Sequence, residues 1–260
     1  MRILVTFAIK AEFSPWAARH PFVPYEFENW ERRREFDLFK ANIGLDEVTV
    51  LLTGMGGDSA ARAMSSVPID LHDLCISTGL AGSLEAALLP GDVVVSHVSE
   101  ALQRDSKASS DGILVDLAAS SGAKPVQVSV TSEKIVKTAV EKEELSRTGS
   151  IVEMESAYIL AAATQRGVPC VAVRAISDTA DEDLPVDFAR ILDSRGHLKM
   201  GGLLKEVGLS PYRIPMLIQF GRQSRAAAKS LADFLDRYIS AISQNWAKIP
   251  HPKIEEVSAT

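Results

Sequence analysis

The chain has 260 residues, of which 46% are hydrophobic and 24% are charged. This is the composition of an ordinary globular protein, and the length suits one large domain or two small ones, with enough core to need no disulfide or metal for stability. The net charge of −6 at pH 7 excludes a broadly basic surface, so we expect no nucleic acid as a partner. Cys75 and Cys170 each lie in an apolar run, and we interpret them as free, buried thiols in a reducing compartment.

The first residues, MRILVTFAIKAE, lack the long apolar stretch of a signal peptide, and no run reaches the length of a membrane-spanning helix. The sequence therefore predicts a cytoplasmic protein without a stable membrane span. Residues 247–260 are polar and contain proline, which predicts a disordered tail after a single domain formed by residues 1–246.

Apolar, β-branched runs alternate with helical patterns along the chain. Short apolar strands between helices predict an α/β fold, with a largely parallel sheet covered on both faces. Strands are expected at residues 2–8, 47–53, 74–78, 92–98, 151–154 and 170–176. Helices are expected at residues 59–66, 133–145, 156–166 and 223–242. Between residues 12 and 45 we expect irregular structure, because three prolines interrupt any long helix there.

Four of these strands end in polar or glycine-rich clusters. Because the carboxyl ends of parallel strands meet at one edge of a sheet, we expect the clusters to converge on a single crevice. The clusters comprise residues 9–12, 54–57, 78–82 and 177–178.

Two groups of acidic residues frame the helix–strand unit from residue 151 to residue 183. Glu153 and Glu155 precede the helix, and Asp178 follows the strand, with three further acids at residues 181–183. Side chains alternate along an extended segment, so only one of Glu153 and Glu155 can face the crevice. Carboxylates from neighbouring elements can hold a polar ligand and do acid–base work on it. Arg174, four residues before Asp178, forms either a structural ion pair with it or part of the site.

Other kinds of site find less support. The order of strand, glycines and helix around Gly54 and Gly56 is typical of a dinucleotide fold, and Asp73 lies at a suitable distance for a ribose-binding acid. Ser59, however, occupies the position of the third glycine. The five histidines share no metal-site spacing, and no serine lies in a G-x-S-x-G elbow, so we expect neither a metal site nor a serine hydrolase.

Five segments stand in order and at consistent spacing along the chain. They are the first ten residues with Glu12, TGLAG at 78–82, GDVVV at 91–95, VEMES at 152–156 and RAISD at 174–178. Together these segments resemble the superfamily of purine nucleoside phosphorylases and methylthioadenosine/S-adenosylhomocysteine nucleosidases. The resemblance covers roughly residues 1–245 and implies a three-layer α/β/α sandwich with a mixed, largely parallel central sheet.

The resemblance implies cleavage of the N-glycosidic bond of a 5′-substituted adenosine or related purine nucleoside. It further implies a homodimer that needs no cofactor, with phosphate as co-substrate if the protein is a phosphorylase. Asp178 would be the general acid at the base, and Glu12 would orient or deprotonate the water. The implied substrate-binding residues are Glu155 at the ribose hydroxyls, Met154 against the sugar, Met55 near the 5′-substituent, and Thr78, Gly79, Leu80, Arg174 and Ser177.

Two positions depart from the family pattern. Many nucleosidases have a serine where this chain has Leu80, and many phosphorylases have an arginine where it has Ser77. Hydrolysis and phosphorolysis therefore both stay open. A non-catalytic, nucleoside-sensing module is the competing interpretation, but Glu12, Glu155 and Asp178 together favour catalysis.

The segment from residue 198 to residue 231 is longer than its counterpart in the compact nucleosidases. It resembles the hopanoid-associated phosphorylase subgroup, whose implied substrate is an adenosylated polycyclic lipid. The segment either widens the 5′-pocket or approaches a membrane with its apolar residues, or it forms a helical hairpin that packs on the body or on a second subunit. The apolar residues concerned are Leu203, Leu204, Met216, Leu217 and Ile218.

Overall fold

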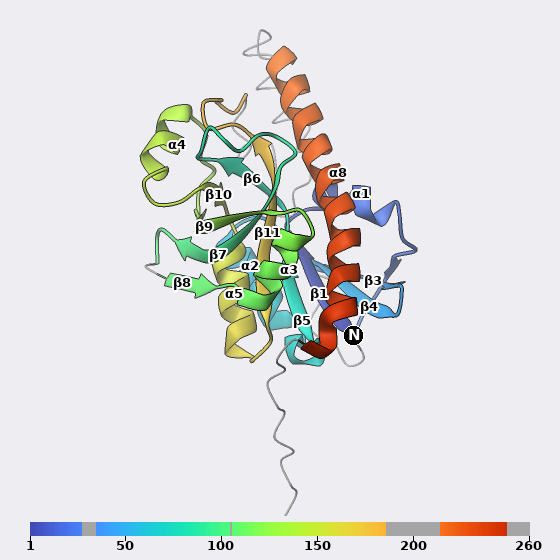
Figure 1. The fold of residues 1–260 in the computed structure, drawn as a ribbon. Coiled ribbons are helices and arrows are strands. Elements are labelled where there is room, and N and C mark those ends of the chain that lie inside the picture. Colours follow the sequence, from blue (N-terminus) through green and yellow to red (C-terminus); the bar gives the residue numbers. More distant parts are fainter. Residues whose placement is uncertain (28–34, 105, 186–213, 249–260) are drawn as a thin grey trace, which may run out of the picture.

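The computed structural model describes residues 1–27, 35–104, 106–185 and 214–248 (Figure 1). Most of the predicted tail, and Leu203 and Leu204 of the predicted C-terminal extension, lie outside these residues. In the described part of the chain no helix combines the length and the apolar character needed to cross a membrane.

The described strands form one mixed sheet in the order β2-β3-β4-β1-β5-β11-β6-β10-β9-β7-β8. Their bounds are β1 Arg2–Phe7, β2 Val23–Pro24, β3 Asp37–Ile43, β4 Asp46–Leu52, β5 Leu74–Ser77, β6 Leu80–Ser83, β7 Val93–Ala101, β8 Ser106–Ser109, β9 Lys124–Thr131, β10 Ile151–Glu153 and β11 Cys170–Asp178.

Strands β4, β1, β5 and β11 are neighbours, and all three contacts between them are parallel. Their carboxyl ends therefore meet at one edge of the sheet, which confirms the predicted convergence of the four strand ends. The two cysteines of this region are free and buried, as expected, and Cys75 on β5 faces Cys170 on β11 in register.

Strand β11 is the central support of that edge. It pairs with β5 at residues 170–172, with β7 at residues 172–175 and with β6 at residues 175–178. The pairing with β7 closes a ring of five strands, β11-β6-β10-β9-β7. All nine residues of β11 are buried, and the register shifts between Ile176 and Asp178. Such a bulge re-aims the side chains next to it, here those of Ser177 and Asp178.

Helices cover both faces of the sheet, so the three-layer α/β/α architecture is confirmed (Figure 1). One face packs against α1 (Lys10–Ala17), α3 (Gly112–Ser120) and α8 (Ile214–Asn245). The other packs against α2 (Gly57–Ser66) and α5 (Ser156–Gln165). Successive side chains of β1 point to opposite faces of the sheet. Val5 lies in the core beneath α1, α3 and α8, and Leu4 in the core beneath α2 and α5.

The long helix α8 packs on β11 and α1 with an apolar stripe at helical spacing. The stripe consists of Ala227, Ala228, Leu231, Ala232, Phe234, Leu235, Tyr238, Ile239 and Ile242. Tyr238 donates a 2.7 Å hydrogen bond to the carbonyl of Leu114 on α3, and Trp16 on α1 donates one of 2.7 Å to Asp236. The helix begins nine residues before the predicted Gln223, because Pro215 fits its first turn, where no backbone N–H is needed.

Two local predictions were wrong for identifiable reasons. The helix predicted at 133–145 begins only at Ala139, as α4 (Ala139–Leu145), because Thr138 caps it and accepts a hydrogen bond from Glu141. Residues 10–17 form α1 although Pro15 lies within it. Pro15 has no N–H for the carbonyl of Ala11, and the hydroxyl of Ser14 donates to that carbonyl instead, at 3.3 Å.

Candidate functional site

A cavity of about 1310 Å³ lies at the edge where the parallel strands end. Its wall comes from the residues after β1, the start of β6, the turn between β10 and α5, the end of β11, and parts of α1 and α8. Among the predicted site residues, those lining it are Glu12, Met55, Leu80, Met154, Glu155, Ser177 and Asp178. The other three, Thr78, Gly79 and Arg174, do not line it.

Glu12 is fixed at the cavity by backbone donors from two loops. One carboxylate oxygen accepts from the amides of Ala8 and Ile9, at 3.0 and 3.4 Å, and the other accepts from the amide of Leu80, at 3.1 Å. Burial raises the pKa of Glu12, and the Leu80 amide opposes that shift most strongly. Glu12 is therefore a preorganised carboxyl with raised proton affinity, as a general base requires.

The backbone between β5 and β6 explains how Leu80 can stand where many nucleosidases have a serine. The backbone amide of Leu80 donates to Glu12, so this contact does not depend on the side chain at residue 80. Gly79 lies against the same carboxylate with φ +150, and a Cβ there would come within 3.3 Å of both oxygens. Thr78 bonds the carbonyl of Thr6 through its hydroxyl, at 2.7 Å, and so positions the loop.

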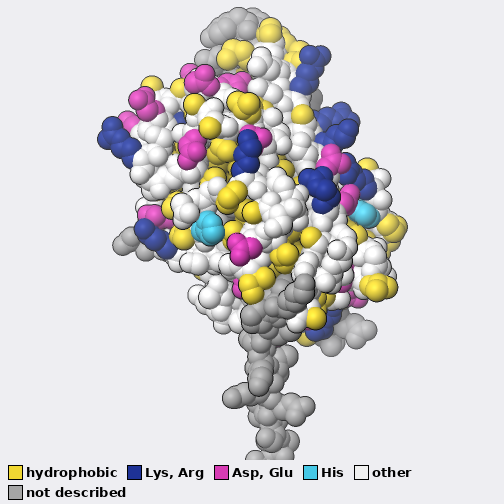
Figure 2. All heavy atoms as spheres, in the orientation of Figure 1, with side chains coloured by type: hydrophobic (Ala, Val, Ile, Leu, Met, Phe, Trp, Pro, Cys, Tyr) yellow, Lys and Arg dark blue, Asp and Glu magenta, His cyan; other side chains and the backbone are white. Residues whose placement is uncertain are grey.

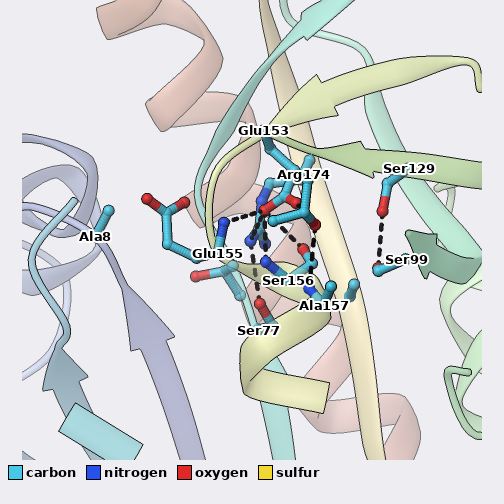
Figure 3. A network of polar contacts seen from close by, with 12 residues as sticks. Ala8, Ser77, Ser99, Ser129, Glu153, Glu155, Ser156, Ala157 and Arg174 are labelled. Atoms are coloured by element: carbon cyan, nitrogen blue, oxygen red, sulfur yellow. Dashed lines mark hydrogen bonds and ion pairs between the residues drawn. The ribbon is translucent and has the colours of Figure 1, made fainter. Parts of the chain in front are cut away.

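Glu155 lies across the cavity, at the start of α5. Its carboxylate accepts a 2.7 Å hydrogen bond from the amide of Gly56, which reaches it from the glycine-rich turn after β4. Burial, and after it the negative charge of Glu153, raises the pKa of Glu155 from an ordinary 4.5 to about 8. In Figure 3 its side chain points away from the neighbouring polar cluster and toward Ala8. Glu155 thus changes charge near neutral pH.

The partner acid, Glu153, is the centre of that polar cluster (Figure 3). One of its oxygens accepts from Thr131; the other accepts from the amides of Glu155 and Ser156, the hydroxyl of Ser156 and the guanidinium of Arg174, at 2.7 to 3.0 Å. Both members of the ion pair are buried, with side chains 0% and 1% exposed. These contacts fix the turn that presents Met154 and Glu155 to the cavity.

Arg174 acts within the same cluster. Besides Glu153, it donates to the hydroxyl of Ser77, at 3.1 Å, and to the carbonyl of Val173, at 2.9 Å. The expected alternative, a structural ion pair with Asp178, is wrong, because Arg174 pairs with Glu153.

Asp178 pairs instead with Lys142 of α4, a residue that the sequence did not single out. The ammonium lies 2.6 Å from one carboxylate oxygen, and the hydroxyl of Ser177 donates to the other at 2.6 Å. Two of the three acids at residues 181–183 make their hydrogen bonds with other residues. Asp183 accepts from the amide of Ala139, and the side chain of Glu182 accepts from Gln223. No spacing in the run AVEKEEL distinguishes Lys142 from its neighbours.

The remaining wall of the cavity is apolar and basic. Leu217 and Phe220 of α8 face it together with Pro15 of α1 and Ala18 directly after α1, whereas Met216 and Ile218 are exposed. Figure 2 shows charged side chains of both signs interspersed with apolar ones over the face that α8 crosses. The basic residues of this wall are Arg19, Lys134, Arg222, Arg225 and Lys229.

The geometry opposes the dinucleotide interpretation. Asp73, the candidate ribose-binding acid, accepts a 2.7 Å hydrogen bond from the amide of Arg2, at the amino ends of β1 and β5. It therefore lies at the opposite edge of the sheet from the glycine turn. Within residues 1–27, 35–104, 106–185 and 214–248, no group of three or more His, Cys, Asp or Glu side chains is placed to hold a metal ion.

Comparisons with known proteins agree with this architecture. A 5′-methylthioadenosine/S-adenosylhomocysteine nucleosidase of Shewanella halifaxensis is 28% identical over 190 residues, covering 62% of this chain and 82% of the relative. A nucleosidase of the same name from Neisseria meningitidis, solved with methylthio-immucillin-A, has a TM-score of 0.69 at 20% identity, over 92% of this chain and 99% of that one. A futalosine hydrolase of Helicobacter pylori has a TM-score of 0.69 at 18% identity, with coverage of 92% and 97%. The family model described as the phosphorylase superfamily matches residues 2–206, and the chain belongs to that superfamily.

Proposed function

We propose that this protein hydrolyses the N-glycosidic bond of a 5′-substituted adenosine or a related purine nucleoside. The observation that carries the proposal is the meeting of Glu12, Glu155 and Asp178 around one cavity. The relatives named as nucleosidases and the family match support the same class of reaction.

The roles follow from the charge that develops when the bond between C1′ and N9 breaks. The sugar becomes positive and the departing base becomes negative. Asp178 donates a proton to the base, which relieves its negative charge. Glu155 binds the ribose hydroxyls, and its ionised form favours the positive sugar. Glu12 orients the attacking water and takes its proton. Met154 lies against the sugar, and Met55 near the 5′-substituent.

Water suits the nucleophile's position better than phosphate does. Among the cations of the described residues, Arg174 lowers the pKa of both Glu12 and Glu155 through its positive charge. Its guanidinium is already bonded to Glu153 and Ser77. A phosphate ion beside Glu12 and Glu155 would face two carboxyl groups, and each of them, once ionised, would repel it in a buried site. The reaction then needs the nucleoside, water and no cofactor.

The cavity leaves room for a large 5′-substituent. A volume of about 1310 Å³ exceeds the upper end of the roughly 300–1,000 Å³ typical of small-molecule sites. The apolar wall formed by Pro15, Ala18, Leu217 and Phe220 suits a 5′-group with an apolar portion, as the similarity of the C-terminal segment to the hopanoid-associated subgroup implies.

Base release from methylthioadenosine, adenosylhomocysteine, adenosine and inosine, each with and without phosphate, tests the proposal. We expect adenine from at least one 5′-substituted adenosine at a rate that phosphate leaves unchanged, with free sugar as the second product. Release that requires phosphate would make the protein a phosphorylase. Binding without any release would favour the sensing module.

The predicted homodimer and the cytoplasmic location belong to the same proposal. The exposed apolar residues at the start of α8, Ile214, Met216 and Ile218, are 39%, 45% and 51% exposed, and exposed apolar surface of this kind supports contact with a second subunit. Light scattering of the purified protein distinguishes a dimer from a monomer.

A further inference from the structure

A buried lysine lies directly behind the proposed general acid. We propose that Lys142 is a positioning residue that orients Asp178 and stabilises the carboxylate left when Asp178 gives its proton to the departing base. The inference rests on the proposed function, since it concerns the leaving-group step of that reaction.

The ammonium of Lys142 is fixed in place. Its side chain is 1% exposed, and its nitrogen lies 2.6 Å from Asp178 Oδ2, 2.6 Å from the carbonyl of Thr179 and 2.8 Å from the carbonyl of Glu182. An ammonium has three N–H donors, and each of the three has an acceptor here. Lys142 does not line the cavity, so it acts on a bound nucleoside through Asp178.

Asp178 is held from three sides. Lys142 bonds one oxygen, Ser177 bonds the other, and the backbone of Gly82 lies so close that a Cβ there would come within 2.9 Å of Oδ2. The carboxyl group therefore keeps one orientation at the cavity wall. A proton donor held in this way needs little reorganisation during the reaction.

The charge of Lys142 matters at one step. Asp178 takes up a proton from solvent before this step. As the bond between C1′ and N9 breaks, its electron pair moves to the base, and the proton of the Asp178 carboxyl moves to a base nitrogen. Water forms the new bond to C1′ and gives its proton to Glu12. Asp178 becomes a carboxylate 2.6 Å from an ammonium, and attraction between opposite charges in a buried site favours that state. Lys142 itself transfers no proton.

A structural role for Lys142 predicts something different. Its bonds to Thr179 and Glu182 tie the loop after β11 to α4. Asp183 ties the same loop to α4 through a different bond, accepting from the amide of Ala139 at 2.7 Å. Asp183→Ala is therefore a matched control, because it loosens the loop and leaves the charge beside Asp178 in place.

Two substrates separate these roles. The first is 5′-methylthioadenosine, whose adenine needs protonation to leave. The second is the matching 5′-methylthioriboside with 4-nitrophenolate as the leaving group, which departs without a proton. We expect Lys142→Met to slow adenine release by about 10–100-fold, part of the 10²–10⁴-fold that general acids contribute. Nitrophenolate release should change less than about threefold, because it bypasses that acid. Lys142→Arg should restore most of the adenine rate, and Asp183→Ala should keep the wild-type ratio of the two rates.

Equal slowing of both substrates by Lys142→Met would overturn the proposal in favour of a structural role, and so would unchanged adenine release. Lys142→Gln, which keeps an N–H donor for the two carbonyls without the charge, decides the matter if the methionine variant does not fold. If the wild-type protein releases neither adenine nor nitrophenolate, the proposed function itself fails, which is a separate result.

Discussion

In the absence of nucleoside, the protein should become less stable as the pH rises, because Glu155 must ionise where burial and the charge of Glu153 disfavour it. The folded protein keeps the Glu155 proton up to a pKa of about 8, whereas a carboxyl with the ordinary pKa of 4.5 loses it in the unfolded chain. Between these values the folded state binds one proton more, so the free energy of unfolding falls by about 1.4 kcal/mol per pH unit.

The magnitude is large enough to measure. The window from 4.5 to about 8 spans 3.5 pH units, which at about 1.4 kcal/mol each amounts to about 5 kcal/mol. Total stabilities are only about 5–15 kcal/mol. The stability linked to Glu155 is fully present below pH 4.5 and is lost as the pH rises through about 8. The raised pKa of Glu12 acts in the same direction.

Urea unfolding of the wild-type protein and Glu155→Gln, without nucleoside, measures this effect at pH 5.5 and 7.5. The glutamine keeps an oxygen for the amide of Gly56 and does not titrate, and Glu12 is common to both proteins. Over these two pH units the wild type should lose about 3 kcal/mol more than the variant, a difference of roughly 1 M in the urea midpoint. Equal losses in the two proteins would refute the reasoning.

Two further predictions concern the framework of the site. Arg174→Met should destabilise the protein by about 3–5 kcal/mol, because it leaves the buried Glu153 carboxylate without its cation. The double variant Glu153→Gln/Arg174→Met should recover part of that loss in a urea double-mutant cycle, and additive losses would show that the pair is not coupled. Tyr238→Phe should lower the free energy of unfolding by about 1 kcal/mol, because the hydrogen bond to the carbonyl of Leu114 is lost. We expect a lower urea midpoint and an unchanged rate of base release. A slower base release would contradict this purely structural account.

The sequence predicted the layers and the crevice well, because buried parallel strands and their polar ends leave a strong local signal. It missed β2, β3, β6, β8 and β9, whose short or interrupted runs depend on neighbouring strands rather than on their own pattern. It also placed α4 too early, since Thr138 begins that helix in the middle of a continuous helical pattern.

The candidate site was predictable only in part. Side chains such as Glu155 and Asp178 could be chosen from the sequence, but contacts made by backbone or by distant residues could not. Glu12 is held by backbone amides, including that of Leu80, and any residue except proline would supply such a donor. Lys142 and Asp178 are 36 residues apart in the sequence, and the local pattern around neither residue predicts their contact.

The most direct test of the central claim, that Asp178 protonates the departing base, is single-turnover release of adenine by the variant Asp178→Asn. Asparagine keeps the size of the side chain and cannot donate a carboxyl proton. We predict release about 10²–10⁴-fold slower than in the wild-type protein, with nucleoside affinity little changed. Adenine released by the variant at the wild-type single-turnover rate would contradict the account.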